Sequence, residues 1–502
     1  MTTIPIGARS TLMVQSLVNM RAQLDELNRQ LGTGQKSTTY AGLGINRGLS
    51  VALNTNLAAI SGYNNTITNV TTRLQLASTT LGRLSEIGTE SKTVAVQASF
   101  DPDSKGQTSA TRAALSGLSE FLSLLNTHVG DHYFFSGSAS DRPAVETTEH
   151  ILDGDGARAG FKQIMEERRQ ADLGSDGLGR LVLSAPTTTS VSIAEDAAGS
   201  PFGFKLSHIA TSIAGATVTQ PGGSPASASI DLGTSNAVAG DTITLQVSLP
   251  DGSKEDIKLT ATTDDPPGIG QFTIGATPDD TAANIQTALA TAIKRTGDTA
   301  LTAASAMAAA DDFFNTDATH PPQRVNGPPF DTATSLVDGT TANTVSWYTG
   351  EAGSSSARGT ATARIDTSIT VSYGMRANEE GIRFILQNLA VQAASTYSGS
   401  DPAVDAERAT ALNARLNANY AGPPGMQSIQ NIAAELAGAQ SSLVAASDRH
   451  RQTAATLQDL QQQITGVSNE EVGSQILALQ TRLTASLQTT SMLYQMSLVN
   501  FL

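Results

Sequence analysis

The stretch that decides the fold is residues 429–467, IQNIAAELAGAQSSLVAASDRHRQTAATLQDLQQQITGV. Its apolar residues recur at alternating spacings of three and four, the heptad pattern of a helix that packs along one narrow seam. The pattern slips between Val467 and Val472 and then resumes toward the end of the chain. It therefore predicts one helical rod from Gly425 to Leu502, roughly 110 Å long. So long a rod must lie against other long helices, either of its own chain or of neighbouring copies.

The start of the chain carries a second heptad seam, closed by Gly32-Thr33-Gly34. An isolated helix of about 20 residues is marginal in water. We therefore expect both ends of the chain to complete their folding on assembly, although a complete monomeric antiparallel bundle fits the periodicity equally well. The predicted assembly-interface residues are Met13, Leu17, Met20, Leu24, Leu27, Leu31, Ile476, Leu479, Leu483, Leu487, Leu493 and Met496.

Composition limits the partners and the chemistry. The chain has 502 residues, a formal net charge of −15 and a pI of about 4.8, which argues against nucleic acid or an anionic membrane as the main partner. It has no cysteine, hence no disulfide, thiolate metal site or thiol nucleophile. No run of 18 apolar residues and no cleavable signal peptide is evident, and the second absence by itself points to the cytoplasm.

The sequence pattern changes twice in the middle of the chain, from heptads to glycine-punctuated segments and then to a stretch rich in small residues. Heptad patterns predict a second long helix, which begins after the glycine-rich break at 32–48, has a seam from Ile60 on and continues to about Ala98. They predict another helix that starts at Asp103 or Ser104 and runs to His132. From 146 to 185 the glycine-punctuated sequence predicts hairpins and turns, and a stretch rich in Thr, Ser, Ala and Gly begins near 187.

Alternating patterns in this stretch predict a β-hairpin over 241–262 and short strands at 271–274 and 345–348. A helix capped by Asp279 or Asp280 is predicted between the two short strands. Helices are predicted again from Ile382 and from Ser400-Asp401-Pro402.

The order of elements is helices, then a β-rich insert, then helices. We therefore predict an α+β fold in which a long antiparallel helical bundle or coiled coil is built from both chain termini, with a β-rich α+β domain inserted in mid-chain. The expected parts are a terminal coiled coil (1–44 with 466–502), a helical rod domain with β-hairpin pieces (45–187 with 362–465) and the insert (188–361).

Candidate chemistry is sparse. His128 and His132 lie four apart on the predicted helix, a spacing that can bind a metal, but no third ligand accompanies them, so packing or surface roles are favoured. Asp153-Gly-Asp-Gly156 lacks the later ligands of a calcium loop and is interpreted as a turn. His-Glu-x-x-His, a phosphate-binding loop and a Gly-x-Ser-x-Gly elbow are all absent from the sequence. We expect no enzyme activity, cofactor or metal.

Three stretches resemble the flagellin and hook-associated protein superfamily of bacterial flagella. Asp131–Pro143 (DHYFFSGSASDRP) is similar to the ending of the family's second core helix. Trp347–Glu351 (WYTGE) with Ser372–Glu379 (SYGMRANE) resembles the return into the core of the junction member, hook-associated protein 3. Leu479–Leu502 is similar to the family C-terminus, whereas Thr39–Arg47 departs from the usual N-terminal pattern.

The resemblance implies a structural protein that is exported uncleaved through the flagellar type III apparatus, with a cytoplasmic export chaperone, and that acts extracellularly. It implies assembly with itself into a helical ring at the hook–filament junction, between hook-associated protein 1 and flagellin or the filament cap, through a coiled coil of terminal helices. It implies no nucleic acid partner and no membrane insertion. A filament flagellin of the same superfamily is the alternative. A surface enzyme or binding protein carried by the insert is a remote one.

Overall fold

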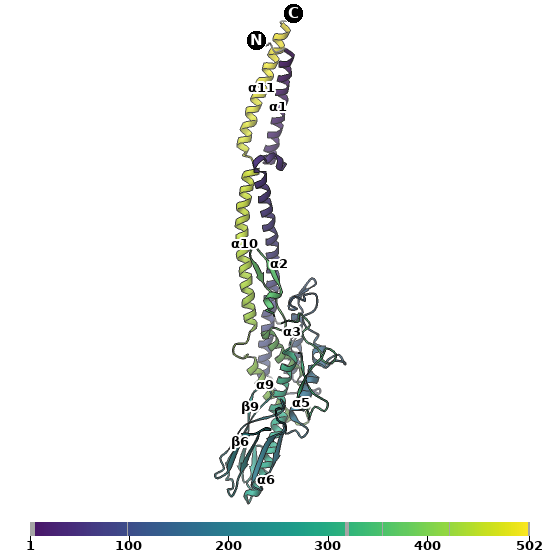
Figure 1. Cartoon of the computed structure of the whole chain (residues 1–502), viewed down its shortest axis with the longest axis vertical. Helices are drawn as coiled ribbons and strands as arrows, with labels where there is room; N and C mark the ends of the chain where they lie inside the picture. The colour runs from purple at the N-terminus through teal and green to yellow at the C-terminus, as the bar shows by residue number, and fades with distance from the viewer. Residues whose placement is uncertain (1–5, 98, 317–320, 354, 421, 500–502) are drawn as a thin grey trace. The chain divides into compact units, whose positions relative to one another are not determined.

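The computed structural model describes residues 6–97, 99–316, 321–353, 355–420 and 422–499. These form two compact units. Unit 1 contains the chain up to Thr72, the segment Ala363–Val371 and the chain from Gln440 on, and unit 2 contains Arg73–Thr362 and Ser372–Ala439. Long helices come from both termini and a β-rich region lies mid-chain, so the predicted α+β class is confirmed (Figure 1).

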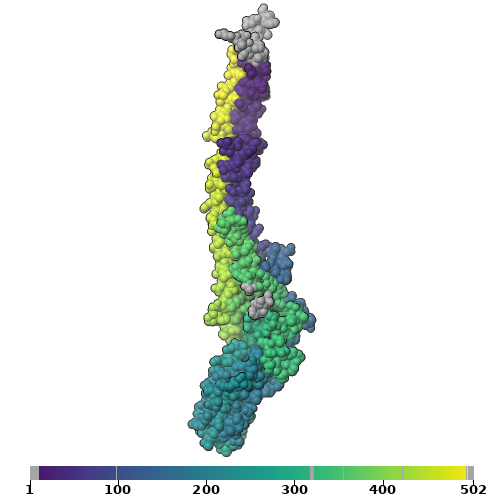
Figure 2. Space-filling view, viewed as in Figure 1, coloured from purple at the N-terminus to yellow at the C-terminus, as the bar shows by residue number. Residues whose placement is uncertain are grey.

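Unit 1 is built from helices of both chain ends. Its helices are α1 (Ile6–Thr33), η1 (Tyr40–Asn46), α2 (Arg47–Gln97), α10 (Ile429–Thr465) and α11 (Asn469–Val499). Helices α2 and α10 continue into unit 2. Unit 1 also holds most of the hairpin of β13 (Thr362–Arg364) and β14 (Thr370–Ser372). Helices α1 and α11 run side by side, as the purple and yellow surfaces show (Figure 2). The helix predicted to follow the glycine-rich break at 32–48 begins at Arg47, three residues after Gly44, which adopts a positive φ of 58°.

The prediction of one unbroken rod over 425–502 is wrong. The helix stops at Thr465 and restarts at Asn469. A Cβ on Gly466 would lie 2.5 Å from the Gln462 carbonyl oxygen, so the tight turn at this position favours glycine. The break falls where the apolar pattern slips by five residues, and that slip was the sequence signal for it.

The seam of α10 is buried where the heptad pattern places it. In unit 1, Leu443 and Ala446 are fully buried, and His450 continues the stripe at 5% exposure. The His450 ring packs on Tyr63 of α2, with ring centroids 5.6 Å apart, and its Nδ1 lies 3.3 Å from the Asn64 side-chain oxygen. His450 therefore has both a ring-packing partner and a polar partner at a buried position.

Unit 2 contains a group of shorter helices. They are α3 (Ser109–Leu125), α4 (Thr148–Asp153), α5 (Phe161–Leu173), α6 (Pro278–Thr296), η2 (Gly297–Leu301), α7 (Thr302–Phe314), η3 (Ala357–Thr360), α8 (Glu380–Ala394) and α9 (Pro402–Asn419). The predicted start of α3 is wrong, because the Thr108 hydroxyl, and neither Asp103 nor Ser104, caps the helix by accepting from the Thr111 amide at 3.1 Å. For α9, the predicted Asp401 cap and first-turn Pro402 are confirmed.

Helices α5 and α7 are among the helices of unit 2 that are not predicted from the sequence. Helix α5 lies where hairpins and turns were expected, because its buried face carries Glu167, Arg168 and Asp172, which look like surface residues in the sequence. Helix α7 is alanine-rich and buried on nearly every side, so it shows no apolar stripe. It packs against α5, α8 and α9.

The β-rich region holds two four-stranded sheets around one apolar core. One sheet has the order β10-β9-β8-β5, and the other β3-β4-β7-β6. Their strands are β3 (Leu181–Ser184), β4 (Ser190–Glu195), β5 (Lys205–Thr211), β6 (Thr217–Gly222), β7 (Ser227–Asp231), β8 (Thr242–Ser248), β9 (Lys254–Thr262) and β10 (Gln271–Thr273). The predicted hairpin is confirmed as β8–β9, and its alternate residues Ile243, Leu245 and Val247 are fully buried.

Helix α6 packs against β9, β10 and β4 and covers this core. Its cap is Thr277, in a capping box with Asp280, so the N-cap predicted at Asp279 or Asp280 is wrong by two or three residues. A further hairpin consists of β11 (Gln323–Val325) and β12 (Leu336–Asp338). The predicted strand at 345–348 is wrong, because Thr344 and Tyr348 make only isolated bridges, to Ala159 and Val145.

A buried ionic cluster joins α5 to α7. The Arg168 guanidinium lies 3.0 Å from an Asp172 carboxylate oxygen and 2.7 Å from one of Asp312. Asp172 also accepts from the Gly203 amide at 2.8 Å. Burial raises the pKa of Asp172, and it raises the pKa of Asp312 to about 6, in each case against the opposing effect of Arg168.

We predict that Asp312 makes unit 2 less stable as the pH rises. Its folded pKa of about 6 exceeds the reference value of 3.8, so the stabilisation is complete below pH 4 and is lost as the pH rises through 6. The loss is up to about 3 kcal/mol. Urea unfolding followed by fluorescence of Trp347, which is fully buried in unit 2, measures it. Asp312→Asn should flatten this pH dependence, and Asp459→Asn on the surface of α10 should not. Equal slopes for wild type and Asp312→Asn would contradict the assignment.

Candidate assembly interface

The helices α1 and α11 form an antiparallel pair within unit 1. The start of α1 and the end of α11 lie at the same end of the pair, where the Thr490 hydroxyl lies 3.8 Å from the Met13 sulfur (Figure 1). Of the predicted interface residues, Ile476 and Leu479 are buried. Those that are partly buried are Met13, Leu17, Met20, Leu24, Leu27 and Leu483. The structure therefore brings these seams together inside one chain.

The remaining predicted interface residues are not buried in the pair. Leu31 is 41% exposed and Leu487 is 51% exposed. Leu493 and Met496 lie outside the residues whose side chains the structure describes. A helix in a two-helix pair can bury only one narrow stripe, so the neighbouring faces stay in contact with water.

Further apolar side chains, which the heptad pattern does not select, are exposed on the same two helices. On α1, Leu12, Val14 and Val18 are at least half exposed, and on α11 the same holds for Leu477 and Met492. The sequence signal was present, because Val14 and Val18 are four residues apart and share a helix face. Apolar residues on more than one face of a helix are typical of a helix that contacts more than one neighbour.

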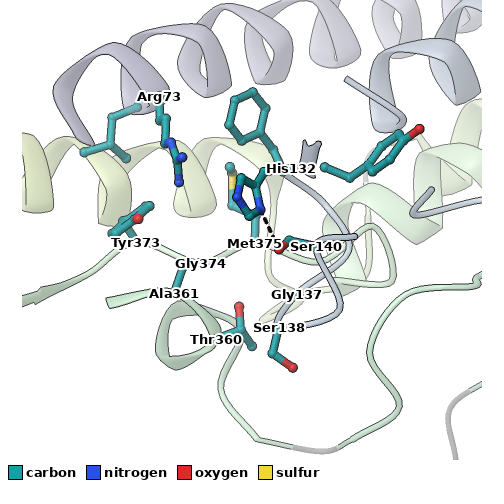
Figure 3. A pocket seen from close by; sticks show the side chains of 13 residues that line it. Arg73, His132, Gly137, Ser138, Ser140, Thr360, Ala361, Tyr373, Gly374 and Met375 are labelled. Atoms are coloured by element: carbon teal, nitrogen blue, oxygen red, sulfur yellow. Dashed lines mark hydrogen bonds between the residues drawn. The ribbon is translucent and has the colours of Figure 1, made fainter. Parts of the chain in front are cut away.

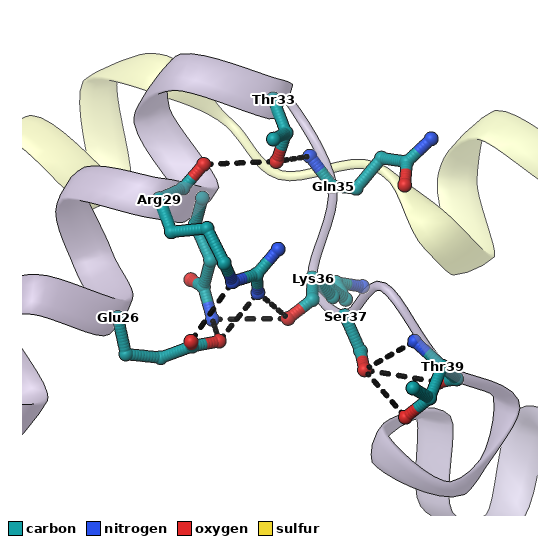
Figure 4. A network of polar contacts seen from close by, with 8 residues as sticks. Glu26, Arg29, Thr33, Gln35, Lys36, Ser37 and Thr39 are labelled. Carbon is teal, nitrogen blue, oxygen red and sulfur yellow. Dashed lines mark hydrogen bonds and ion pairs between the residues drawn. The ribbon is translucent and has the colours of Figure 1, made fainter.

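The loop that ends α1 is held by a local polar network (Figure 4). Arg29 forms an ion pair with Glu26, and its Nη2 and the Gln30 side chain both donate to the Lys36 carbonyl oxygen, at 3.1 and 3.0 Å. The hydrogen bonds that Arg29 and Gln30 donate to the Glu26 carboxylate lower the pKa of Glu26 to about 2. The network fixes the exit of the chain from α1.

The same loop pairs with the break between α10 and α11. Gln35 and Gly466 form an antiparallel bridge, in which the Lys36 amide donates to the Thr465 carbonyl at 2.7 Å. The Val467 amide donates to the Gly34 carbonyl at 3.1 Å. The two helix breaks are therefore joined by backbone hydrogen bonds, which places the starts and ends of α1 and α11 in register.

In unit 2, the stretches quoted from the sequence meet at one place, which we call the motif cluster (residues 131–143, 347–353 and 372–379). Ser136 and Arg376 form an antiparallel bridge. The Gly137 amide donates to the Met375 carbonyl at 3.0 Å, and the Ala377 amide donates to the Phe135 carbonyl at 2.8 Å. Segments more than 230 residues apart in the sequence are thus paired through their backbones.

Glu351 joins the middle stretch to the other two. Its amide donates to the Ser136 carbonyl at 2.9 Å, and its carboxylate accepts from the Ser138 amide at 2.9 Å and lies 3.7 Å from Arg376. A Cβ on Gly137, whose φ is +66°, would lie 2.5 Å from this carboxylate. The glycine of the Phe-Ser-Gly sequence is therefore required by both its backbone conformation and its neighbour.

Glu379 closes the motif cluster at the start of α8. It accepts from the Arg376 amide at 3.0 Å and forms an ion pair with Arg358, which also lies 2.9 Å from Glu435 of α10. Burial raises the pKa of Glu379, while Arg358 opposes the rise. Arg376 and Glu379 thus form a polar support for the helix that follows.

The histidines predicted to share a helix lie instead on a two-residue hairpin of β1 (His128–Val129) and β2 (His132–Tyr133), so the helical premise is wrong. His128 packs on Tyr133, with ring centroids 4.7 Å apart, and the His132 Nδ1 lies 3.0 Å from the Ser140 hydroxyl. Within the described ranges, no three His, Asp or Glu residues cluster as a metal site. Asp155 accepts from the Arg158 amide at 2.7 Å in the bend after α4.

Comparison with known families gives one match. Residues 8–140 match the family described as the bacterial flagellin N-terminal helical region. This range covers α1, α2 and α3 and ends within the motif cluster. No curated protein shows significant similarity to the chain. None of the described helices is both long and apolar enough for a membrane span.

The match supports a place in the flagellin superfamily. Members of that superfamily are structural subunits of the bacterial flagellum that assemble with copies of themselves outside the cell. The long helix pairs of unit 1 and the exposed apolar residues on α1 and α11 agree with such a subunit.

We predict that Gly374→Ala destabilises unit 2 by about 1–3 kcal/mol, because a Cβ there would lie 2.1 Å from the Thr360 hydroxyl and 2.5 Å from the Ala357 carbonyl oxygen. Gly82→Ala is the matched control. Its Cβ meets nothing within 4 Å on the exposed face of α2, so it should be neutral or stabilising. Urea unfolding monitored by Trp347 compares the two. Equal stability of both variants would show that the motif cluster tolerates a Cβ at Gly374.

Proposed function

We propose that the protein is the hook–filament junction subunit of a bacterial flagellum, which connects the hook to the flagellin filament. The observation that carries this proposal is the motif cluster, in which Ser372–Glu379, the stretch resembling the junction member, pairs with Asp131–Pro143. Three of its residues have a local role there, since Gly374 fits against Thr360, and Arg376 and Glu379 bond to neighbouring segments.

The proposed organisation has three parts. The terminal coiled coil consists of 1–44 with 466–502, the rod domain of 45–187 with 362–465, and the variable insert of 188–361. The break at 466–468 and the bridge between Gln35 and Gly466 support the first boundary. The strands β4–β10, which lie within 188–361 and share an apolar core with α6, support the insert.

The proposed partners follow from this role. Copies of the chain form a helical ring, hook-associated protein 1 lies on the hook side, and flagellin or the filament cap lies on the other. A cytoplasmic chaperone and the type III export apparatus deliver the unfolded chain without cleavage of a signal peptide. The absence of cysteine suits this route, because a chain without disulfides needs no oxidative folding.

Location of the protein on the flagellum tests the junction assignment. We expect an epitope tag in the exposed Gly223–Pro225 turn between β6 and β7, detected by immunogold electron microscopy, to mark a short band at the hook end. Deletion of the gene should leave hooks intact and release flagellin into the medium. Labelling along the whole filament would instead identify a filament flagellin, and normal filaments in the deletion strain would exclude the junction role.

Substitution of an exposed apolar residue tests the assembly interface. Leu487→Asp should leave the monomer folded, because the side chain is half exposed in the single chain. It should prevent incorporation into the polymer, where an unpaired charge would be buried at a high cost. Gln488→Asp, which adds the same charge at the next exposed position, is the control and should assemble normally. Circular dichroism and sedimentation measure the two properties, and assembly of Leu487→Asp at wild-type yield would remove Leu487 from the interface.

A further inference from the structure

Unit 2 has a small hollow beside the motif cluster (Figure 3). Its volume is about 100 Å³, which accommodates several water molecules or the end of one side chain. The walls are α2 at Arg73 and Leu74, the β2 turn from His132 to Ser140, and the returning segments 360–361 and 373–375. All of these belong to unit 2.

The polar groups of the hollow suit an anion. The Arg73 side chain extends from α2 into it (Figure 3). The His132 Nδ1 is engaged by the Ser140 hydroxyl at 3.0 Å. The hydroxyl groups of Ser138, Thr360 and Tyr373 complete the polar lining, which includes no carboxylate. The Thr360 hydroxyl donates to the Ala357 carbonyl at 2.8 Å, so Ser138 and Tyr373 are the hydroxyl donors beside Arg73. An arginine with hydroxyl donors and no acid is complementary to a negative group.

Arg73 differs from the arginines around it in lacking an acidic partner within the described part of the chain. Arg83, three turns further along α2, lies 2.6 Å from Glu120 and 3.0 Å from Glu90. In the motif cluster, Arg376 and Arg358 pair with Glu351 and Glu379. The chain has 46 acidic and 31 basic residues, so acids are in surplus on its surface. A half-buried arginine that remains unpaired in such a chain is available to a carboxylate from outside.

The shape of the hollow is fixed by backbone contacts. Gly374 lies so close to the Ala357 carbonyl and the Ala361 amide that a Cβ there would come within 2.6 Å of both. Met375 accepts from the Gly137 amide, and the Tyr373 amide donates to the Ala361 carbonyl at 2.9 Å. A site held in this way loses little conformational entropy when it is filled.

We propose that this hollow receives an aspartate or glutamate side chain from a second copy of the chain, with Arg73 as its ion-pair partner. The proposal rests on the proposed function, because it requires copies of the chain to assemble. Charge complementarity selects the occupant: the hollow offers one unpaired cation, and a second copy brings surplus carboxylates. The contact specifies how neighbouring copies dock through unit 2, in addition to the apolar contacts of the terminal helices.

The test compares full-length variants in assembly. Arg73→Gln should raise the critical concentration for assembly about tenfold, and Arg73→Glu should raise it further, because each removes one partner of an interfacial charge pair and the second adds repulsion. Lys254→Glu, with the same charge change at an exposed position of β9, is the control and should assemble like wild type. Salt should weaken assembly of the wild type more than that of Arg73→Gln.

A second experiment identifies the partner carboxylate. Exposed acids are changed one at a time to lysine in a copy that is mixed with Arg73→Glu, and restored co-sedimentation at one position is the expected result. Circular dichroism of each soluble variant establishes that it is folded.

The outcomes separate the two proposals. If the wild type does not assemble, the proposed function fails. If the wild type and Arg73→Glu assemble equally well, the docking inference is wrong and the proposed function stands. Saturable binding of inorganic phosphate by the wild type, lost in Arg73→Gln while assembly is unchanged, would identify a free anion as the occupant and would also overturn the inference.

Discussion

The structure depends on the pairing of the two ends of the chain. Helices α1 and α11 are separated by more than 430 residues, yet each buries its one heptad stripe mainly against the other. A pair of helices without a third neighbour leaves most of each helix surface in water, and several of the exposed side chains are leucine, valine or methionine. The pair therefore has apolar surface that identical neighbours can cover, and that surface is what makes the chain suitable as a subunit.

The motif cluster joins the segments that enter and leave the mid-chain insert. Because the long helices come from both ends of the chain, the segment before the insert and the segment after it must lie next to each other in a fixed register. Backbone pairing of Gly137 with Met375 and of Phe135 with Ala377 joins the departing and returning segments directly. Glu351 and Arg376 add charged contacts that are partly shielded from water. The sheets over β3–β10 are anchored to the helices of unit 2, because their apolar core includes Leu173 of α5 and Ala304 of α7.

The sequence predicted the elements whose side chains follow a simple period. The heptad positions of α10, the alternation in β8 and β9, and the Asp-Pro start of α9 all appear in the structure. Prediction from the sequence failed for helices that bury polar residues or that are buried on nearly all sides. Helix α5 hides an arginine and two acids, and α7 is buried on nearly all sides, so neither shows a polar and an apolar face. The spacing of His128 and His132 continues the stripe of α3 and therefore predicts helix where the structure has a hairpin.

The sites were predictable to different degrees. Spacing alone predicts most of the seam residues of α1 and α11, but it does not predict the additional exposed apolar residues such as Val14 and Leu477. The hollow at Arg73 is lined by residues from three segments that are distant in the sequence, and no local sequence pattern predicts it. Similarly, the hydrogen bond from the Ser138 amide to the Glu351 carboxylate is found only in the three-dimensional structure, because a single glutamate between two motifs has no sequence signature.

The central claim is that the terminal helix pair is completed by neighbouring copies. Amide hydrogen exchange measured by mass spectrometry on the dilute chain and on the assembled protein tests it most directly. The account predicts rapid exchange over 6–33 and 469–499 in the dilute chain and strong protection of both segments after assembly, with little change in β8 and β9. Equal and strong protection of the two terminal segments in the dilute chain and in the assembly would contradict it.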